Sequence, residues 1–262
     1  MLPRPRGKTF SSVACALCLP GILLTIYPTV TATEKTQSNV VCRENFSIES
    51  RNELAAKLRK ITGWSELDFD REGALRLGHA ASVGGSSTAR ELLAAAVYEK
   101  KVVVLEDSSK SEDVAFSRVI PGQWKHSAPD SPPAFVVQID FSDFNQVLGD
   151  RLALEAFNVG WGVLHELDHI VNDSPDATLP GETGECEAHI NQMRRECNLP
   201  QRADYFYTLS PLTENTVFMT RLVRLAFELD ESPTNKKKRY WLVWDARVVG
   251  GLDQLKQIAA LR

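Results

Sequence analysis

The chain has 262 residues, of which 43% are hydrophobic and 24% are charged, the composition of an ordinary globular protein. This composition excludes disordered, fibrous and collagen-like classes, and 5 cysteines are too few for a disulfide scaffold. The net charge is -4, and the residues after position 32 carry 27 basic against 34 acidic side chains. Nucleic-acid binding needs a basic surface, so we expect no nucleic-acid partner.

Residues 1–32 have the pattern of a secretory signal peptide. Three basic residues precede an apolar stretch over 10–27, and residues 30–32 supply the small side chains of a cleavage site. We expect cleavage after Ala32 and a secreted or periplasmic protein. The alternative is an uncleaved membrane anchor. No second apolar run reaches membrane length, so we expect no membrane contact once the leader is removed.

Three cysteines follow the leader: Cys42, Cys186 and Cys197. The last two lie about 16 Å apart along one predicted helix and cannot bond to each other. Any internal disulfide would therefore use Cys42, with either of the other two as its partner.

The first half of the mature chain predicts a mixture of helices and strands. Periodicity and turn residues give the following elements in order: a polar linker over 33–46, a helix over 47–61, a hairpin over 66–77, a serine-capped helix over 88–100, and strands over 101–106, 114–120 and 134–141. The last strand fits either a sheet edge that binds an extended substrate or the centre of a sheet.

The second half predicts two long helices followed by a hairpin. The expected elements are a helix over 151–171, a loop over 172–184, a helix over 185–198, strands over 217–229 and 239–249, and a terminal helix over 252–261. A helix over 217–229 is the alternative to the first of these strands. The basic run 236–239 is expected at the hairpin tip. No linker divides residues 47–262, so we predict one α+β domain.

The motif His165-Glu166-Leu167-Asp168-His169 lies within a predicted helix and has the form H-E-x-x-H. Histidines four residues apart lie about 40° apart around a helix, so both imidazoles can bind one Zn²⁺. Glu166, one position on, reaches a water at the metal and can accept its proton. The pattern therefore predicts a hydrolytic zinc site with Glu166 as general base.

A catalytic zinc site usually has three protein ligands, and the next helix offers candidates for the third. The candidates are Glu185, Glu187 and His189, which flank an apolar stripe formed by Cys186, Ile190, Met193 and Cys197. Glu187 and Asn191 lie on one side of this stripe, and Glu185 and His189 lie on the other. Periodicity does not choose between the two sides.

An H-E-x-x-H motif followed, after a short loop, by a glutamate on a second helix resembles the glutamate-type zincin metallopeptidases. The resemblance implies that Glu187 is the third ligand and that Asn191, four residues later, orients a histidine ligand. Residues 162–200 also resemble metallopeptidase domains of bacterial polymorphic toxins. The implied fold is zincin-like: a small mixed or antiparallel sheet packed on the H-E-x-x-H helix, here with a C-terminal hairpin.

The sequence suggests supporting roles for other residues near the motif. Asp168 is within reach of a hydrogen bond to a ligand, although a charge at a helix rim is more often solvated. Tyr205, Tyr207 and His189 are candidate donors to the oxyanion that forms during amide hydrolysis.

The sequence thus predicts an exported zinc metallopeptidase that acts on a peptide or protein. One alternative is a zinc-binding structural or interaction module without turnover, although such a module has no need of Glu166. Another is a secreted, toxin-like effector whose peptidase cleaves one target protein. The oligomeric state does not follow from the sequence.

Overall fold

The computed structural model describes residues 38–78, 81–109, 111–126, 128–211, 219–231 and 236–249. The expected leader and the expected helix over 252–261 lie outside these residues. The described helices are α1 Ile48–Thr62, α2 Ser87–Tyr98, α3 Phe141–Gln146, α4 Arg151–Ala156, α5 Val159–Asn172 and α6 Gly184–Glu196. None of them has the length and apolar character that crossing a bilayer requires.

The strands form a mixed sheet, a second sheet built around a long hairpin, and a small two-stranded pair. Their bounds are β1 Val40–Cys42, β2 Asp68–Phe69, β3 Leu75–Arg76, β4 Val102–Asp107, β5 Ser117–Pro121, β6 Ala134–Ile139, β7 Leu148–Gly149, β8 Gln201–Arg202, β9 Thr208–Pro211, β10 Met219–Glu231 and β11 Lys236–Asp245. The prediction of an α+β protein is confirmed at this level.

The first sheet has the order β1-β4-β6-β5. Strands β1, β4 and β6 run parallel, and β5 pairs antiparallel with β6. The strand over 134–141 is therefore central, and β5 is the edge. Part of the segment expected to be a linker, 40–42, forms β1 and belongs to the fold.

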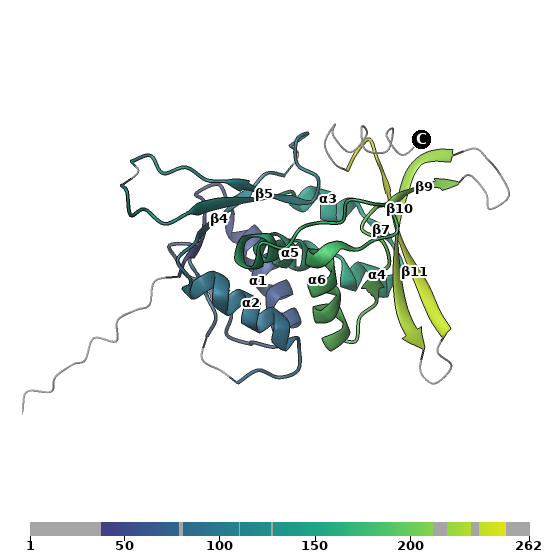
Figure 1. Cartoon of the computed structure of the whole chain (residues 1–262), viewed down its shortest axis with the longest axis horizontal. Helices are drawn as coiled ribbons and strands as arrows, with labels where there is room; N and C mark the ends of the chain where they lie inside the picture. Colours follow the sequence, from purple (N-terminus) through teal and green to yellow (C-terminus); the bar gives the residue numbers. More distant parts are fainter. Residues whose placement is uncertain are drawn as a thin grey trace, which may run out of the picture. The chain divides into compact units, whose positions relative to one another are not determined.

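Helices α1, α2 and α5 lie together on one side of this sheet (Figure 1). Ser47 and Ser86 cap the first two helices by accepting hydrogen bonds from backbone N–H groups, and a serine cap is what the sequence predicts for the second. Leucines on the helices pack against β-branched and leucine side chains of the strands, which forms one continuous core: Leu54, Leu58, Leu93, Leu164, Leu167, Val103, Leu105, Val137 and Ile139. Helix α5 runs through the middle of this arrangement and is held from several sides.

The predicted helix over 151–171 is wrong in one respect, because it is two helices. Phe157 has an extended backbone, and Asn158 caps α5 by accepting a hydrogen bond from the Gly160 N–H. This break lets α4 contact β11 while α5 contacts the first sheet.

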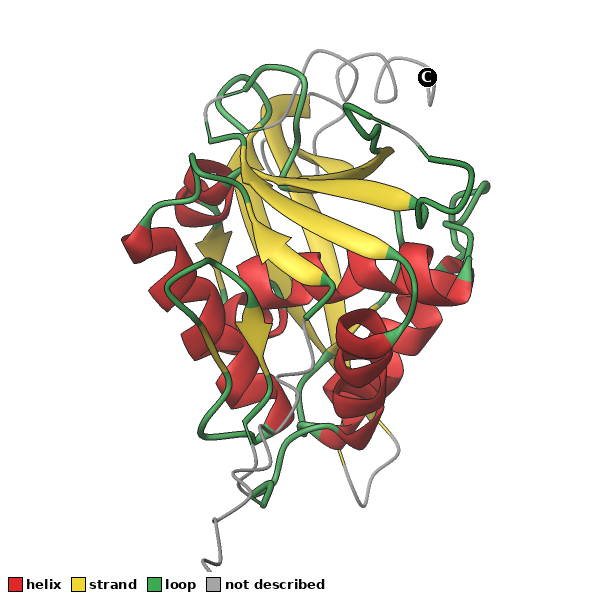
Figure 2. Ribbon diagram, turned by 90° about the vertical axis from the view of Figure 1, so that its left-hand side faces the viewer, coloured by secondary structure: helices red, strands yellow, loops and turns green. Residues whose placement is uncertain are grey.

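The long hairpin is confirmed as β10 and β11, so the alternative of a helix over 217–229 is wrong. Its buried face forms a second apolar cluster with α4: Ala153, Ala156, Val223, Leu225, Phe227, Leu242 and Trp244. The basic run 236–239 begins β11 and is exposed, close to the hairpin tip as predicted. Figure 2 shows the strands of the molecule flanked by the helices.

Candidate metal centre

Helix α5 presents both motif histidines on one face. Leu164, Leu167 and Ile170 are buried in the core, whereas the His165 and His169 side chains are 13% and 19% exposed. The two Nε2 atoms lie 3.2 Å apart. The predicted pairing of the histidines is therefore present in the structure.

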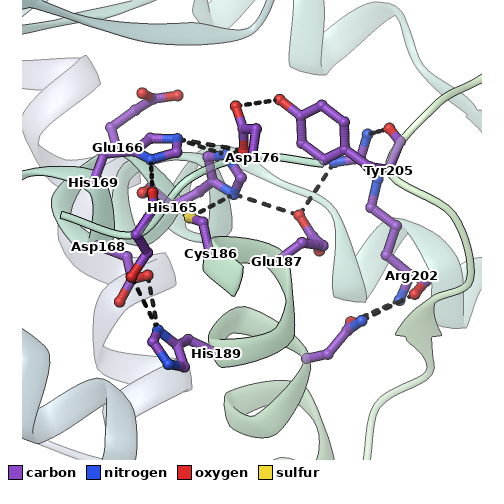
Figure 3. A network of polar contacts seen from close by, with 12 residues as sticks. His165, Glu166, Asp168, His169, Asp176, Cys186, Glu187, His189, Arg202 and Tyr205 are labelled. Atoms are coloured by element: carbon purple, nitrogen blue, oxygen red, sulfur yellow. Dashed lines mark hydrogen bonds and ion pairs between the residues drawn. The ribbon is translucent and has the colours of Figure 1, made fainter. Parts of the chain in front are cut away.

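The turn after α5 brings a third candidate ligand back to the histidines. The helix ends at Asn172, and Asp173 adopts a left-handed backbone with φ 57°, which reverses the chain. The Pro175 carbonyl then accepts hydrogen bonds from the backbone at the start of α6. This anchored loop places the Asp176 carboxylate beside the imidazoles (Figure 3).

The Asp176 Oδ1 atom lies 3.2 Å from Nε2 of His165 and 3.5 Å from Nε2 of His169. In a tetrahedron with metal–ligand bonds of about 2.0–2.1 Å, ligand atoms are separated by about 3.3–3.4 Å. The three mutual distances among these atoms are therefore those of three ligands around one small cation.

Two further observations fit a cation at this position. Within the described part of the chain, the buried Oδ1 of Asp176 meets no donor with hydrogen-bond geometry, although it faces both imidazoles. The His169 Nδ1 lies 2.6 Å from the Ser174 carbonyl and must donate to it, so the neutral ring has its lone pair on Nε2, facing the cluster.

The carboxylate of Asp176 and the two imidazoles stabilise each other's charged forms. Burial by itself would raise the pKa of Asp176, but the two adjacent imidazoles lower it well below its usual range. The adjacent carboxylate of Asp176 raises the pKa of His169 to about 11. Burial would lower the pKa of His165, but its acidic neighbours raise it overall. A bound cation would take the place of these protons beside the carboxylate.

Glu187, the ligand implied by resemblance, lies on the other side of His165. Its Oε2 is 3.4 Å from the Nδ1 of His165, and Cys186 Sγ lies 3.4 Å from the same nitrogen. Glu187 is buried and forms ion pairs with Arg194 and, at 3.2 Å, with Arg202. Burial by itself would raise the pKa of Glu187, but the two guanidinium groups lower it well below its usual range.

The structure thus brings together four possible metal ligands, whose donor atoms all lie within 4.8 Å of one another: His165, His169, Asp176 and Cys186. Sequence reasoning missed Asp176 and assigned Cys186 only to an apolar stripe. Asp176 lies in a loop where no periodicity applies. The turn-forming stretch 172–175 was the one available indication that the chain reverses there.

Glu166 is buried, and its Oε1 accepts a hydrogen bond of 2.9 Å from Ser117 of the edge strand β5. Burial raises the pKa of Glu166, which makes this carboxylate a stronger base. Ser117 is a second residue that sequence reasoning missed, because it comes from a distant strand.

The remaining candidates have contacts of other kinds. Asp168 is fully buried, so the expectation that it is solvated is wrong; it accepts hydrogen bonds from Asn172 and from His189, at 3.0 Å. Asn191 contacts Arg194 and the backbone of Arg202 and makes no contact with either motif histidine. Glu185 is exposed at the start of α6.

The two tyrosines contact different parts of the site. The Tyr205 hydroxyl donates to Asp176 Oδ2 at 2.7 Å, and its ring stacks on His165 with centroids 6.1 Å apart. Tyr207 packs edge-on against Trp244. Both line a cavity of about 350 Å³ that His165 and Glu166 also line.

The three cysteines that follow the expected leader are all free in the structure, so none of the disulfides considered from the sequence is formed. Comparison with known proteins finds no family model, no characterised protein and no solved structure that matches this chain.

Proposed function

We propose that this protein is a zinc-dependent hydrolase that cleaves peptide bonds. The observation that carries the proposal is the triangle of His165 Nε2, His169 Nε2 and Asp176 Oδ1, with distances of 3.2–3.5 Å, beside the buried carboxylate of Glu166. Three protein ligands with a cavity next to them are the arrangement of a catalytic zinc site. Asp176 takes the role that the resemblance implied for Glu187.

A zinc ion held there would supply the Lewis acidity that activates water and polarises a carbonyl at neutral pH. Glu166 accepts the proton of the attacking water and returns it to the leaving nitrogen. Ser117 holds one carboxylate oxygen of Glu166, so the other oxygen is the one that moves the proton. Asp176 is oriented by a hydrogen bond from Tyr205. His169 is oriented by its hydrogen bond to the Ser174 carbonyl.

The proposal includes a zincin-like arrangement. The edge strand β5 contacts α5 and supplies Ser117 to the site. Its free edge is the place where an extended peptide can add as a strand, next to Glu166. The expected leader is the basis for proposing that this activity is exported.

Substitution of Glu166 tests the mechanism. Glu166→Gln should retain a full complement of zinc and lose hydrolysis of casein or a mixed peptide pool by at least about 100-fold, because the general base is gone. His165→Ala should lose the metal. Metal content of the purified proteins and rates on the same substrates provide the two readouts. Wild-type rates in Glu166→Gln would disprove the mechanism.

Cys186 supports a second candidate, a closed metal site without turnover. Its sulfur lies close enough to be a fourth ligand, and four protein ligands are typical of structural zinc. The variant Cys186→Ala separates the two functions. A three-ligand catalytic site keeps its zinc and its activity in this variant, whereas a closed site loses zinc affinity by a large factor.

A further inference from the structure

The cavity beside Glu166 has a second end that the hydrolytic chemistry does not use. Its volume of about 350 Å³ is at the small end of the range for ligand pockets, so it suits one large side chain better than a whole ligand. His165 and Glu166 line one end. The rest of the lining comes from the loop before β5, from β5, α3, Phe157 between α4 and α5, the start of α5, α6, β8, the segment 205–207, β10 and β11.

The walls of this part are aromatic and rigid. Phe116 is the central ring, with centroid distances of 5.2 Å to Phe144, 4.9 Å to Phe157 and 5.4 Å to Trp244. All four residues line the cavity, together with Leu225. These four rings pack against one another and give this end of the cavity an aromatic lining.

The backbone of Phe116, in the cavity wall, is strained. Its φ of 61° is unfavourable for a phenylalanine. Asp143 accepts a hydrogen bond from the Phe116 N–H at 3.0 Å, and the Asp140 N–H donates to the Phe116 carbonyl at 2.8 Å. These contacts keep the ring in the wall and place the next residue, Ser117, against Glu166.

The charged residues of the lining do not favour an acidic ligand. Arg194 and Arg202 are both paired with Glu187, and Arg202 also donates to the backbone carbonyls of Asp204 and Tyr205. Asp113 and Arg118 are the exposed charged residues of the lining; their charges are opposite, and Arg118 Nε donates to Gln138 Oε1 at 2.8 Å. The aromatic end of the cavity is therefore apolar, and the buried charges Glu187, Arg194 and Arg202 compensate one another.

We infer that this aromatic pocket receives a large apolar side chain, aromatic or leucine-like, of the substrate residue next to the scissile bond. The inference rests on the proposed peptidase function, because the pocket begins at Glu166. It assigns the substrate class: peptides with Phe, Tyr, Trp, Leu or Met beside the cleaved bond, and not small or charged residues there.

Mapping of cleavage sites tests the specificity. The zinc-loaded protein is incubated with a defined pool of synthetic peptides, and the products are identified by mass spectrometry. We expect large apolar residues to be enriched at least about 10-fold at one of the two positions flanking the cut, since apolar pockets discriminate by factors of that order. Cleavage without this enrichment, or dominated by acidic residues, would overturn the inference while leaving the peptidase function intact.

Two variants locate the preference in the pocket. Ala115 is half-buried in the lining, so Ala115→Leu should shrink the cavity and shift cleavage toward Gly and Ala. Tyr207→Ala should enlarge it and favour Trp. Tyr240→Ala is the matched control, because Tyr240 packs on the same apolar cluster as Tyr207 but does not line the cavity. An equal change in the control would contradict the assignment.

A binding measurement gives a readout that does not depend on turnover. Affinities of N-acetyl-phenylalanine amide and N-acetyl-glycine amide are measured by calorimetry or NMR titration on zinc-loaded Glu166→Gln protein. We expect the phenylalanine amide to bind at least about 10-fold tighter, and Ala115→Leu to remove the difference. Equal affinities would overturn the pocket assignment. If the phenylalanine amide binds preferentially but the wild-type protein cleaves no peptide, the pocket assignment stands and the proposed peptidase function is disproved.

Discussion

At the scale of single residues, the site depends on hydrogen bonds that orient the proposed ligand side chains. Each of the two proposed ligands, His169 and Asp176, has one atom facing the cluster and one hydrogen-bonded to a neighbour: Ser174 for the histidine and Tyr205 for the aspartate. Such contacts fix the ring tautomer and the carboxylate orientation before any metal binds. On its Nδ1 side, His165 adjoins Cys186 and Glu187, each at 3.4 Å.

Tyr205 should therefore control metal affinity without being a ligand. Tyr205→Phe removes the hydrogen bond to Asp176 and retains the ring that stacks on His165. We expect zinc affinity to fall about 10- to 100-fold, as for other contacts behind a metal ligand. Competition with a zinc chelator measures the change. Tyr207→Phe, which leaves the Asp176 contact in place, is the control, and an equal loss there would contradict the assignment.

Third-ligand identity is also decided at this scale. Asp176→Ala should lose zinc, because it removes one corner of the triangle. Measurement of metal content on the folded fraction tests this. Full occupancy in Asp176→Ala would return the third-ligand role to Glu187 or Cys186, both of which adjoin His165.

At the scale of elements, the chain uses side chains of one helix to cap another. The Glu196 carboxylate, at the end of α6, accepts hydrogen bonds from the hydroxyls of Ser86, Ser87 and Thr88 and from the Thr88 backbone N–H. These groups lie at the start of α2, where a negative charge is stabilised by the free N–H groups and the helix dipole. The contact ties α2 to α6, and α2 and α6 both pack on α5.

The stability contributed by Glu196 should depend on pH. Burial by itself would raise the pKa of Glu196, but hydrogen bonds from Thr88, Ser86 and Gln192 lower it to about 2, from an ordinary value of 4.5. Since the folded-state pKa is the lower one, the contribution is complete above about pH 4.5 and is lost as the pH falls toward 2.

Chemical denaturation of Glu196→Gln and wild type gives the test. At pH 7 the variant should be less stable by about 1–2 kcal/mol, the range for losing a charged cap. The difference should shrink between pH 4.5 and pH 2. A difference that stays constant over this range would contradict the assignment, and exposed Glu185→Gln is the control.

At the scale of the whole molecule, a buried ion network links the two apolar clusters. Arg194 on α6 pairs with Glu187 and donates to the Ala156 carbonyl of α4, while its guanidinium lies over Trp161 in one cluster and Phe227 in the other. Arg202 on β8 pairs with the same carboxylate. The buried Glu187 carboxylate therefore compensates one guanidinium group from α6 and a second from β8.

Removing that charge should destabilise the entire domain. Glu187→Gln leaves the buried Arg194 without a counter-charge, and breaking a buried pair in this way costs about 3–5 kcal/mol. The folded fraction of the variant should still bind zinc, because the triangle of ligands is intact. Thermal unfolding and metal content are the two measurements. Zinc loss with unchanged stability would instead identify Glu187 as a ligand.

The sequence alone was sufficient for local features of this protein. Helical spacing predicted α1, a serine cap helped to predict α2, and a polar loop between two strand candidates predicted the hairpin β10–β11. The H-E-x-x-H motif placed His165 and His169 on one face. These features depend on contacts between residues that are near each other along the chain, and such contacts leave a periodic pattern.

Only the tertiary structure decided the rest. Asp176 reaches the histidines through an irregular turn, Ser117 reaches Glu166 from an edge strand 49 residues away, and Glu187 is drawn to two arginines. The aromatic pocket combines rings from distant parts of the chain, among them Phe116, Phe144, Phe157 and Trp244. None of these contacts produces a regular pattern in the sequence, because each depends on how distant elements pack. Local pattern thus predicted the chemistry, and packing determined which residues take part in it.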